Sequence, residues 1–190
     1  MEDKNKNAKL SRRKIREELF KIIFGLEFNE NLKLKDNLND LDLNEFKKEA
    51  ARKQVENYIE LSKDIINEED KRYIEKVIDI YLDNRKDILQ NIEKYLKDTW
   101  RLDRITKISI SLIQLAIIEI KYMNLDYKIA INEALEISKK YQDEKEVKFI
   151  NGILSNFVSE NENNKENNNN ENSKIIKNGN KETIDDIINE

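Results

Sequence analysis

Residues 127–157, which read YKIAINEALEISKKYQDEKEVKFINGILSNF, contain two helical patterns joined by a short polar link. In the first pattern, Ala130, Ala134 and Ile137 recur at the spacing of one helix face. The second pattern keeps an apolar spacing but places Gly152 in the middle of a helix. Gly at such a position costs about 1 kcal/mol relative to Ala, so we expect another helix to approach closely there. The stretch predicts two amphipathic helices of an α-domain.

The composition of the whole chain favours an all-α fold. The 190 residues include no Pro and only three Gly, so few residues break a helix. A hydrophobic share of 38% suffices for one core or for two small helical subdomains. The longest apolar run, residues 108–120, is too short to span a bilayer and is predicted to be the central buried helix. No signal-peptide pattern opens the chain, so we expect a cytoplasmic protein.

The helical patterns predict about seven helices in two packed subdomains, within one domain over residues 10–158. Besides the two helices of the opening stretch, the expected helices cover residues 11–27, 44–66, 71–82 and 85–97 and a buried segment that ends near residue 122. Residues 1–9 are expected to be a disordered basic N-terminus. Residues 159–190 form a low-complexity tail rich in Asn, Glu and Lys, which we expect to be disordered.

The residue types absent from the chain disfavour enzymatic activity. It has no Cys and no His, which removes thiolate chemistry, the usual general base and the commonest metal ligand. The sequence also has no Gly-rich phosphate loop and no nucleophile elbow. We therefore expect a binding protein without catalytic activity, cofactor or metal.

A basic run near the N-terminus is the strongest functional feature of the residues themselves. On a helix, Lys9, Arg12, Arg13 and Arg16 lie three or four residues apart and line one surface strip. Guanidinium groups on such a strip suit phosphate oxygens. The alternative is a solvated face balanced by neighbouring acidic residues, and the pattern alone does not decide between the two.

Five motifs in their order along the chain resemble the NusB family of transcription antitermination factors. They are RRKIRE at residues 12–17, WRLDR at 100–104, IEI at 118–120, AINEA at 130–134 and FINGIL at 149–154. The likeness runs from about residue 11 to residue 157. It implies a helical NusB-like domain that binds single-stranded boxA RNA together with the ribosomal protein NusE. It also implies action within the antitermination complex with RNA polymerase, in support of ribosomal RNA transcription.

The resemblance also implies which residues bind RNA and which bind the partner. The RNA contacts would be Arg12, Arg13, Lys14, Arg16, Lys145, Lys148 and Phe149. For Phe149, the alternative is a core position in register with Ile153. The partner surface would include Ser109 and Glu119 on the buried helix, whose start Ser109 would cap. The sequence departs from the family pattern at Ser109 and at Gln114.

Two other functions fit the same residues. Some ribosomal RNA cytosine-5 methyltransferases carry a NusB-like domain, so the chain could be a related RNA-binding domain. A helical scaffold for protein interactions, without RNA binding, is the third reading.

Overall fold

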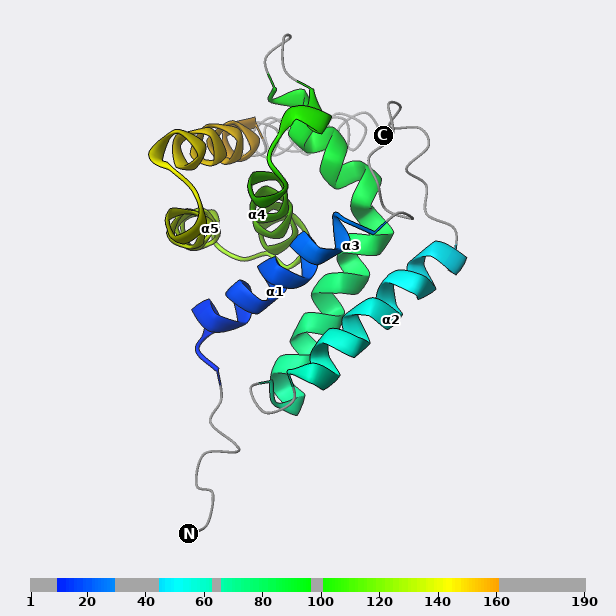
Figure 1. The fold of residues 1–190 in the computed structure, drawn as a ribbon. Coiled ribbons are helices and arrows are strands. Elements are labelled where there is room, and N and C mark those ends of the chain that lie inside the picture. The colour runs from blue at the N-terminus through cyan, green and yellow to red at the C-terminus, as the bar shows by residue number, and fades with distance from the viewer. Residues whose placement is uncertain (1–9, 30–44, 63–65, 97–100, 161–190) are drawn as a thin grey trace, which may run out of the picture. The chain divides into compact units, whose positions relative to one another are not determined.

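The computed structural model describes residues 10–29, 45–62, 66–96 and 101–160, and every regular element in these ranges is helical (Figure 1). The labelled elements are α1 (Arg12–Leu26), α2 (Glu45–Leu61), α3 (Glu68–Lys94), the 3-10 helix η3 (Leu102–Arg104), α4 (Lys107–Ile117), the π-helix η4 (Ile118–Tyr122) and α5 (Tyr127–Tyr141). A further helix spans residues 144–160. The predicted all-α class is confirmed.

Helix α1 follows the predicted pattern from its first residue. Its N-cap is Ser11, whose hydroxyl accepts a hydrogen bond from the Lys14 amide at 3.2 Å. The side chains of Ile15, Leu19 and Ile23 are fully buried. Helix α1 contacts α2, α3, α4 and α5, so the basic residues of its first turns lie beside the other helices.

Helix α2 buries only a narrow part of its apolar surface. Phe46 is 78% exposed and Leu61 is 90% exposed. The buried apolar residues of α2 are Ala51, Val55 and Ile59. This narrow stripe holds α2 against α1 and α3.

Helix α3 has a kink at the predicted break. The sequence pattern predicts separate helices over residues 71–82 and 85–97; α3, from Glu68 to Lys94, consists of two helical segments that meet at Asn84, whose dihedral angles are non-helical. The Asn84 side-chain amide donates to the carbonyl oxygen of Ile80 at 2.9 Å. Because this bond competes with the helical hydrogen bonding and no Gly or Pro is present, the helix kinks there but does not end.

Helix α4 is the predicted central buried helix. All of its residues from Ser109 to Ile117 are buried, and it packs against α1, α3 and α5 (Figure 1). Its N-cap is Thr106 rather than Ser109: the Thr106 hydroxyl accepts from the Ser109 amide at 3.1 Å. The π-helix η4 extends α4, and the following turn contains Asn124 with a φ of 56°, a left-handed conformation that Asn tolerates.

The expected close approach of a helix to Gly152 is not found. A Cβ atom built at Gly152 would meet no atom of the described residues within 4 Å, and the residue is exposed. The packing explanation for this Gly is therefore wrong.

The chain divides into two compact units, Met1–Leu154 and Ser155–Glu190. The helix over residues 144–160 belongs to both, and residues 159 and 160, expected in the tail, are still helical. The domain bounds of 10–158 stay a prediction, and the predicted disordered segments otherwise lie outside the described residues. In the described ranges, no helix combines the length and apolarity needed to cross a bilayer.

A buried ion pair joins the end of α1 to α3. The Glu27 carboxylate is 1% exposed and accepts hydrogen bonds at 2.9 Å from Arg85 Nη1 and from the Tyr81 hydroxyl. Burial opposes ionisation of Glu27, but the charge of Arg85 and the two donors outweigh it and lower the pKa of Glu27. The charged form of Glu27 therefore depends on Arg85.

We predict that Arg85→Met destabilises the fold by about 3–5 kcal/mol, because the Glu27 carboxylate would lose its buried cation and keep only the half-exposed cation of Lys107, 3.7 Å from Oε2. Urea unfolding followed by circular dichroism measures this free energy. The matched control is Arg52→Met, which breaks a surface pair with Asp79 of 3.0 Å and should cost less than about 1 kcal/mol. Equal losses in the two variants would contradict the prediction.

Candidate nucleic-acid interface

The basic strip of α1 is held beside α3 from its start. The amide of Leu10, just before α1, donates to the Asp70 carboxylate of α3 at 3.4 Å. Within the next six residues the structure describes four cations, Arg12, Arg13, Lys14 and Arg16, to which the name strip now refers. Lys9, the first residue of the predicted strip, lies outside the described residues. The surroundings of the four cations differ, and the differences decide which of them can meet a ligand.

Arg16 lies inside the protein. It is 8% exposed, and its Nε lies 2.8 Å and 3.0 Å from the two carboxylate oxygens of Glu119, which is 2% exposed. The Tyr73 hydroxyl donates to the same carboxylate at 3.0 Å. Burial raises the pKa of Glu119 against the opposing effects of Arg16 and Tyr73. This cluster joins α1, α3 and η4.

Arg13 and Lys14 are partly exposed to solvent, but each forms an ion pair with a carboxylate. Arg13 Nε and Nη2 donate to the two oxygens of Glu133 on α5 at 3.0 Å and 2.8 Å, while half of the Arg13 side chain stays exposed. The hydrogen bond from Arg13 lowers the pKa of Glu133. Lys14 Nζ lies 3.3 Å from Glu18 Oε1. A phosphate group would have to compete with these carboxylates.

Arg12 differs from the other three cations. Its guanidinium carbon lies 5.1 Å from the centre of the Tyr73 ring, and the residue is exposed. Among the residues that the structure describes, no carboxylate forms an ion pair with it. Arg12 is therefore the member of the strip whose hydrogen-bond donors are most available.

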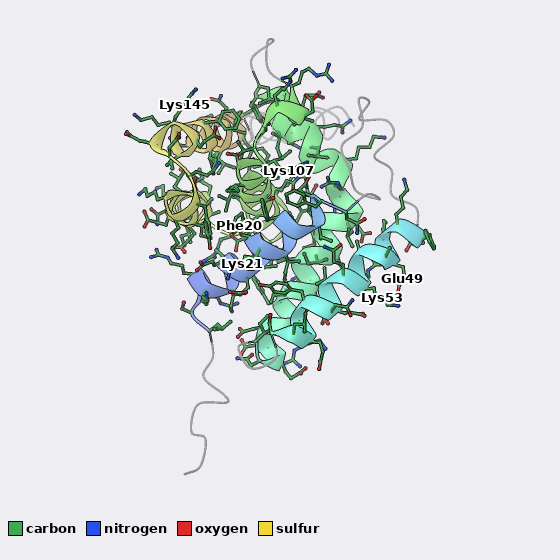
Figure 2. All side chains as sticks on the ribbon, viewed as in Figure 1. Phe20, Lys21, Glu49, Lys53, Lys107 and Lys145 are labelled. Atoms are coloured by element: carbon green, nitrogen blue, oxygen red, sulfur yellow. The ribbon has the colours of Figure 1, made fainter. Side chains whose placement is uncertain are left out.

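The predicted contacts beyond α1 lie near the start of the helix over residues 144–160. Lys145 is exposed and projects outward from this helix (Figure 2). Lys148 is also exposed and pairs with Glu144 at 2.7 Å. Phe149 is half-buried, which fits its core alternative better than an open stacking ring. Of the three, Lys145 is the side chain best placed to attract an anion.

Helix α5 connects these two regions. Near its end, the Lys140 ammonium and the Tyr141 hydroxyl donate to the Glu17 carboxylate of α1 at 3.1 Å and 2.9 Å. The Arg13 contact with Glu133 adds a second link between α5 and α1. The α1 strip is thus fixed to the helix that precedes Lys145 in the chain.

Neither predicted partner residue is at the surface. Ser109 is 0% exposed; its hydroxyl donates to Glu146 at 2.7 Å and accepts from the Gln142 side chain at 2.8 Å. Glu119 is held by Arg16 and Tyr73. The expectation that these two residues contact a partner directly disagrees with their burial. Their positions suit them to hold the surrounding helices in place.

Four aromatic residues form a row that the sequence prediction did not identify; its two ends are exposed, while Phe20 in the middle is buried and Phe24 is half-buried. The ring centres of Phe20 and Phe24 on α1 are 5.9 Å apart, and the ring of Phe28, just past the end of α1, lies 5.1 Å from that of Phe24. The ring of Tyr141 on α5 lies 5.2 Å from that of Phe20. Phe28 is 58% exposed and Tyr141 is 42% exposed. We call these four residues the aromatic row. Their i, i+4 spacing on α1 is a visible signal, but it also fits a helix core.

Sequence reasoning also missed Tyr73 and Glu133 as parts of the site. The sequence pattern predicts Tyr73 as a core residue of the third helix and Glu133 as a solvated residue of the AINEA motif. Each meets a cation of α1 that is distant in sequence. No local pattern contains that information.

Comparison with known proteins gives one consistent result. A model described as the NusB family matches residues 13–159. The transcription antitermination protein NusB of Enterococcus faecalis is 30% identical over 161 residues, which cover 84% of this chain and 97% of that protein. The corresponding protein of Ligilactobacillus salivarius is 35% identical over 101 residues, covering 53% of this chain and 77% of that protein.

Solved structures agree with the sequence comparisons. T. maritima NusB aligns with a TM-score of 0.61 at 25% identity, covering 80% of this chain and 94% of that one. A structure of the antitermination factors NusB and NusE in complex with dsRNA gives a TM-score of 0.58 at 23% identity, covering 78% of this chain and 96% of the aligned chain. The latter similarity supports the fold alone.

The different surroundings of Arg16 and Arg12 lead to a stability prediction. Arg16→Met should destabilise the protein by about 3–5 kcal/mol, because the buried Glu119 carboxylate loses its cation. Arg12→Met should cost about 1 kcal/mol or less, the range of an exposed cation–π contact. Urea unfolding of both variants measures the difference. An Arg16 variant as stable as the Arg12 variant would contradict the structural role of Arg16.

Proposed function

The chain belongs to the NusB family, and on this premise we propose that it is a transcription antitermination factor that binds boxA-type single-stranded RNA together with the ribosomal protein NusE. The observation that carries the RNA-binding part is the exposed cationic start of α1, where Arg12, Arg13 and Lys14 reach solvent. We propose that the protein acts in the cytoplasm, in ribosomal RNA transcription, and without catalytic activity.

The charges of the strip support binding to a nucleic-acid backbone. Single-stranded RNA is held by cationic surfaces, and the resulting affinity falls as salt concentration rises. Arg13 already binds a planar carboxylate through two nitrogens, which is also the geometry by which Arg binds phosphate. Lys145 and Lys148 would extend the contact, and Phe149 stays a proposed neighbour. For Arg16 we propose an indirect role, in which it holds α1 in place.

For the partner, we propose contact through the aromatic row rather than through Ser109 or Glu119. Exposed aromatic side chains grouped on one surface are typical of protein interfaces. Tyr141 and Phe28 are the exposed ends of this row, and the Tyr141 end lies beside α1, where its hydroxyl donates to Glu17. A partner bound at the Tyr141 end of the row would lie near RNA held at the start of α1.

Similarity over 97% of the length of the E. faecalis protein favours this function over a methyltransferase-related RNA-binding domain. The scaffold reading differs from the proposal in having no RNA to bind, so an RNA-binding measurement decides between them.

We expect a boxA RNA oligomer to bind more tightly when the ribosomal partner is present, with both affinities falling as salt rises. With Arg12, Arg13 and Lys14 in contact with RNA phosphates, the logarithm of the association constant should fall by about two for each tenfold rise in salt concentration. Fluorescence anisotropy measures this. The double variant Arg12→Gln, Arg13→Gln should lose affinity and salt dependence, whereas Lys53→Gln on α2 should not (Figure 2).

Sequence preference is the second requirement of the same experiment. A scrambled single strand and a duplex of the same length serve as controls for the boxA oligomer. Equal affinity for RNA with and without the partner, or equal affinity for boxA and scrambled RNA, would contradict the proposed function.

We also predict that Glu133→Gln strengthens RNA binding by about two- to fivefold, because removal of a surface ion pair releases the donors of Arg13 for phosphate. The control is Glu136→Gln on the same helix, which makes the same charge change but whose carboxylate bonds to Lys139. If the two variants gain equally, the effect is general charge. If Glu133→Gln weakens binding, Glu133 orients Arg13 for RNA instead of competing for it.

A further inference from the structure

Arg12 sits on a fixed aromatic ring, in contrast to the other cations of the strip. Arg13, Lys14 and Arg16 each direct a nitrogen at a carboxylate within 3.3 Å. Arg12 instead places its guanidinium over the Tyr73 ring, 5.1 Å from the ring centre. The guanidinium carbon therefore lies over the Tyr73 ring, while the residue as a whole is exposed.

The Tyr73 ring is fixed at its hydroxyl end by Glu119. Its hydroxyl donates to Glu119 Oε1 at 3.0 Å, and the same oxygen lies 2.8 Å from Arg16 Nε. Burial and the neighbouring Glu119 charge raise the pKa of Tyr73, so the hydroxyl remains a donor at neutral pH. A ring fixed at its hydroxyl end presents a constant surface to Arg12.

We propose that Arg12 stacks against a base of the bound RNA, with Tyr73 as the backing ring and Glu119 as the residue that positions Tyr73. The inference rests on the proposed RNA-binding function and assigns Arg12 a base contact in addition to the attraction of its charge for the RNA backbone. A guanidinium is planar, delocalised and weakly hydrated, so it stacks on aromatic rings. Bases of single-stranded RNA stack in the same way on aromatic side chains and on guanidinium planes.

The surroundings of Arg12 and Arg13 suit them to different parts of an RNA strand, a base and a phosphate. Arg13 presents two nitrogens in the plane of its guanidinium, as the bidentate bond to Glu133 shows, and this edge matches a phosphate. Arg12 lies over the Tyr73 ring and is exposed, so the side of its guanidinium that points away from Tyr73 is available for a second ring. RNA bound across this turn of α1 would meet a phosphate contact and a base contact on consecutive residues.

The test combines Arg12→Lys with RNA oligomers that each lack one base. Lysine keeps the positive charge but has no plane to stack. On intact boxA RNA, Arg12→Lys should weaken binding about five- to tenfold, the lower part of the range for loss of one stacked base. On the one abasic oligomer that lacks the stacked base, wild type and Arg12→Lys should bind equally, because the phosphate remains and only the base is gone.

Matched variants separate stacking from charge and from folding. Arg13→Lys should weaken binding by the same factor on every abasic oligomer, as expected for a phosphate contact. Tyr73→Leu should behave like Arg12→Lys, whereas Tyr73→Phe, which keeps the ring, should lose less. Urea unfolding of each variant shows whether a change in RNA affinity reflects loss of the fold.

Two outcomes would overturn the stacking role while leaving the proposed function intact. One is an Arg12→Lys effect of the same size on every abasic oligomer, which identifies a phosphate contact. The other is no effect of Arg12→Lys on any oligomer. Failure of the wild-type protein to bind boxA RNA at all would overturn both the stacking role and the proposed function.

Discussion

The carboxylate of Glu119 is almost completely removed from water, and the arrangement of the helices around it depends on that burial. A buried carboxylate is tolerated when cations and donors surround it. Here Arg16 comes from α1 and Tyr73 from α3, while Glu119 itself lies in η4. The requirement to satisfy one charge therefore fixes three elements against one another, and it sets the position of the α1 strip at the surface.

Local patterns predict the features that depend on neighbouring residues. Ser11 caps α1, residues 108–120 are buried along most of their length, and α5 ends at Tyr141, where its apolar spacing ends. The contacts within the site depend instead on partners far apart in sequence: Arg16 meets Glu119 across 103 residues. A helical pattern shows that a cation lies beside an apolar face, but it does not show whether a distant carboxylate covers that cation. For this reason the helical pattern places Arg16 on a surface strip although it is buried. The family resemblance places Ser109 at the surface, and that residue is buried as well.

Pairing within the protein also changes what the basic strip implies. A count of charges over the first helix suggests a strongly attractive surface, yet Glu133 and Glu18 occupy much of its hydrogen-bonding capacity. A surface of this kind attracts anions more weakly at long range than its count of cations indicates. Discrimination between nucleic acids then depends more on groups that recognise shape and bases than on net charge.

The π-helix η4 adds a constraint on the length of the chain. A π-turn contains about one residue more than an α-turn, and one residue in an α-helix corresponds to a rotation of about 100°. Deleting a single residue from Ile118–Tyr122 would restore regular α-helical geometry but would rotate the downstream residues relative to α4. Glu119 and Tyr122 could then no longer both face their present partners, Arg16 and Asp87. This segment should therefore accept substitutions more readily than insertions or deletions when homologous sequences diverge.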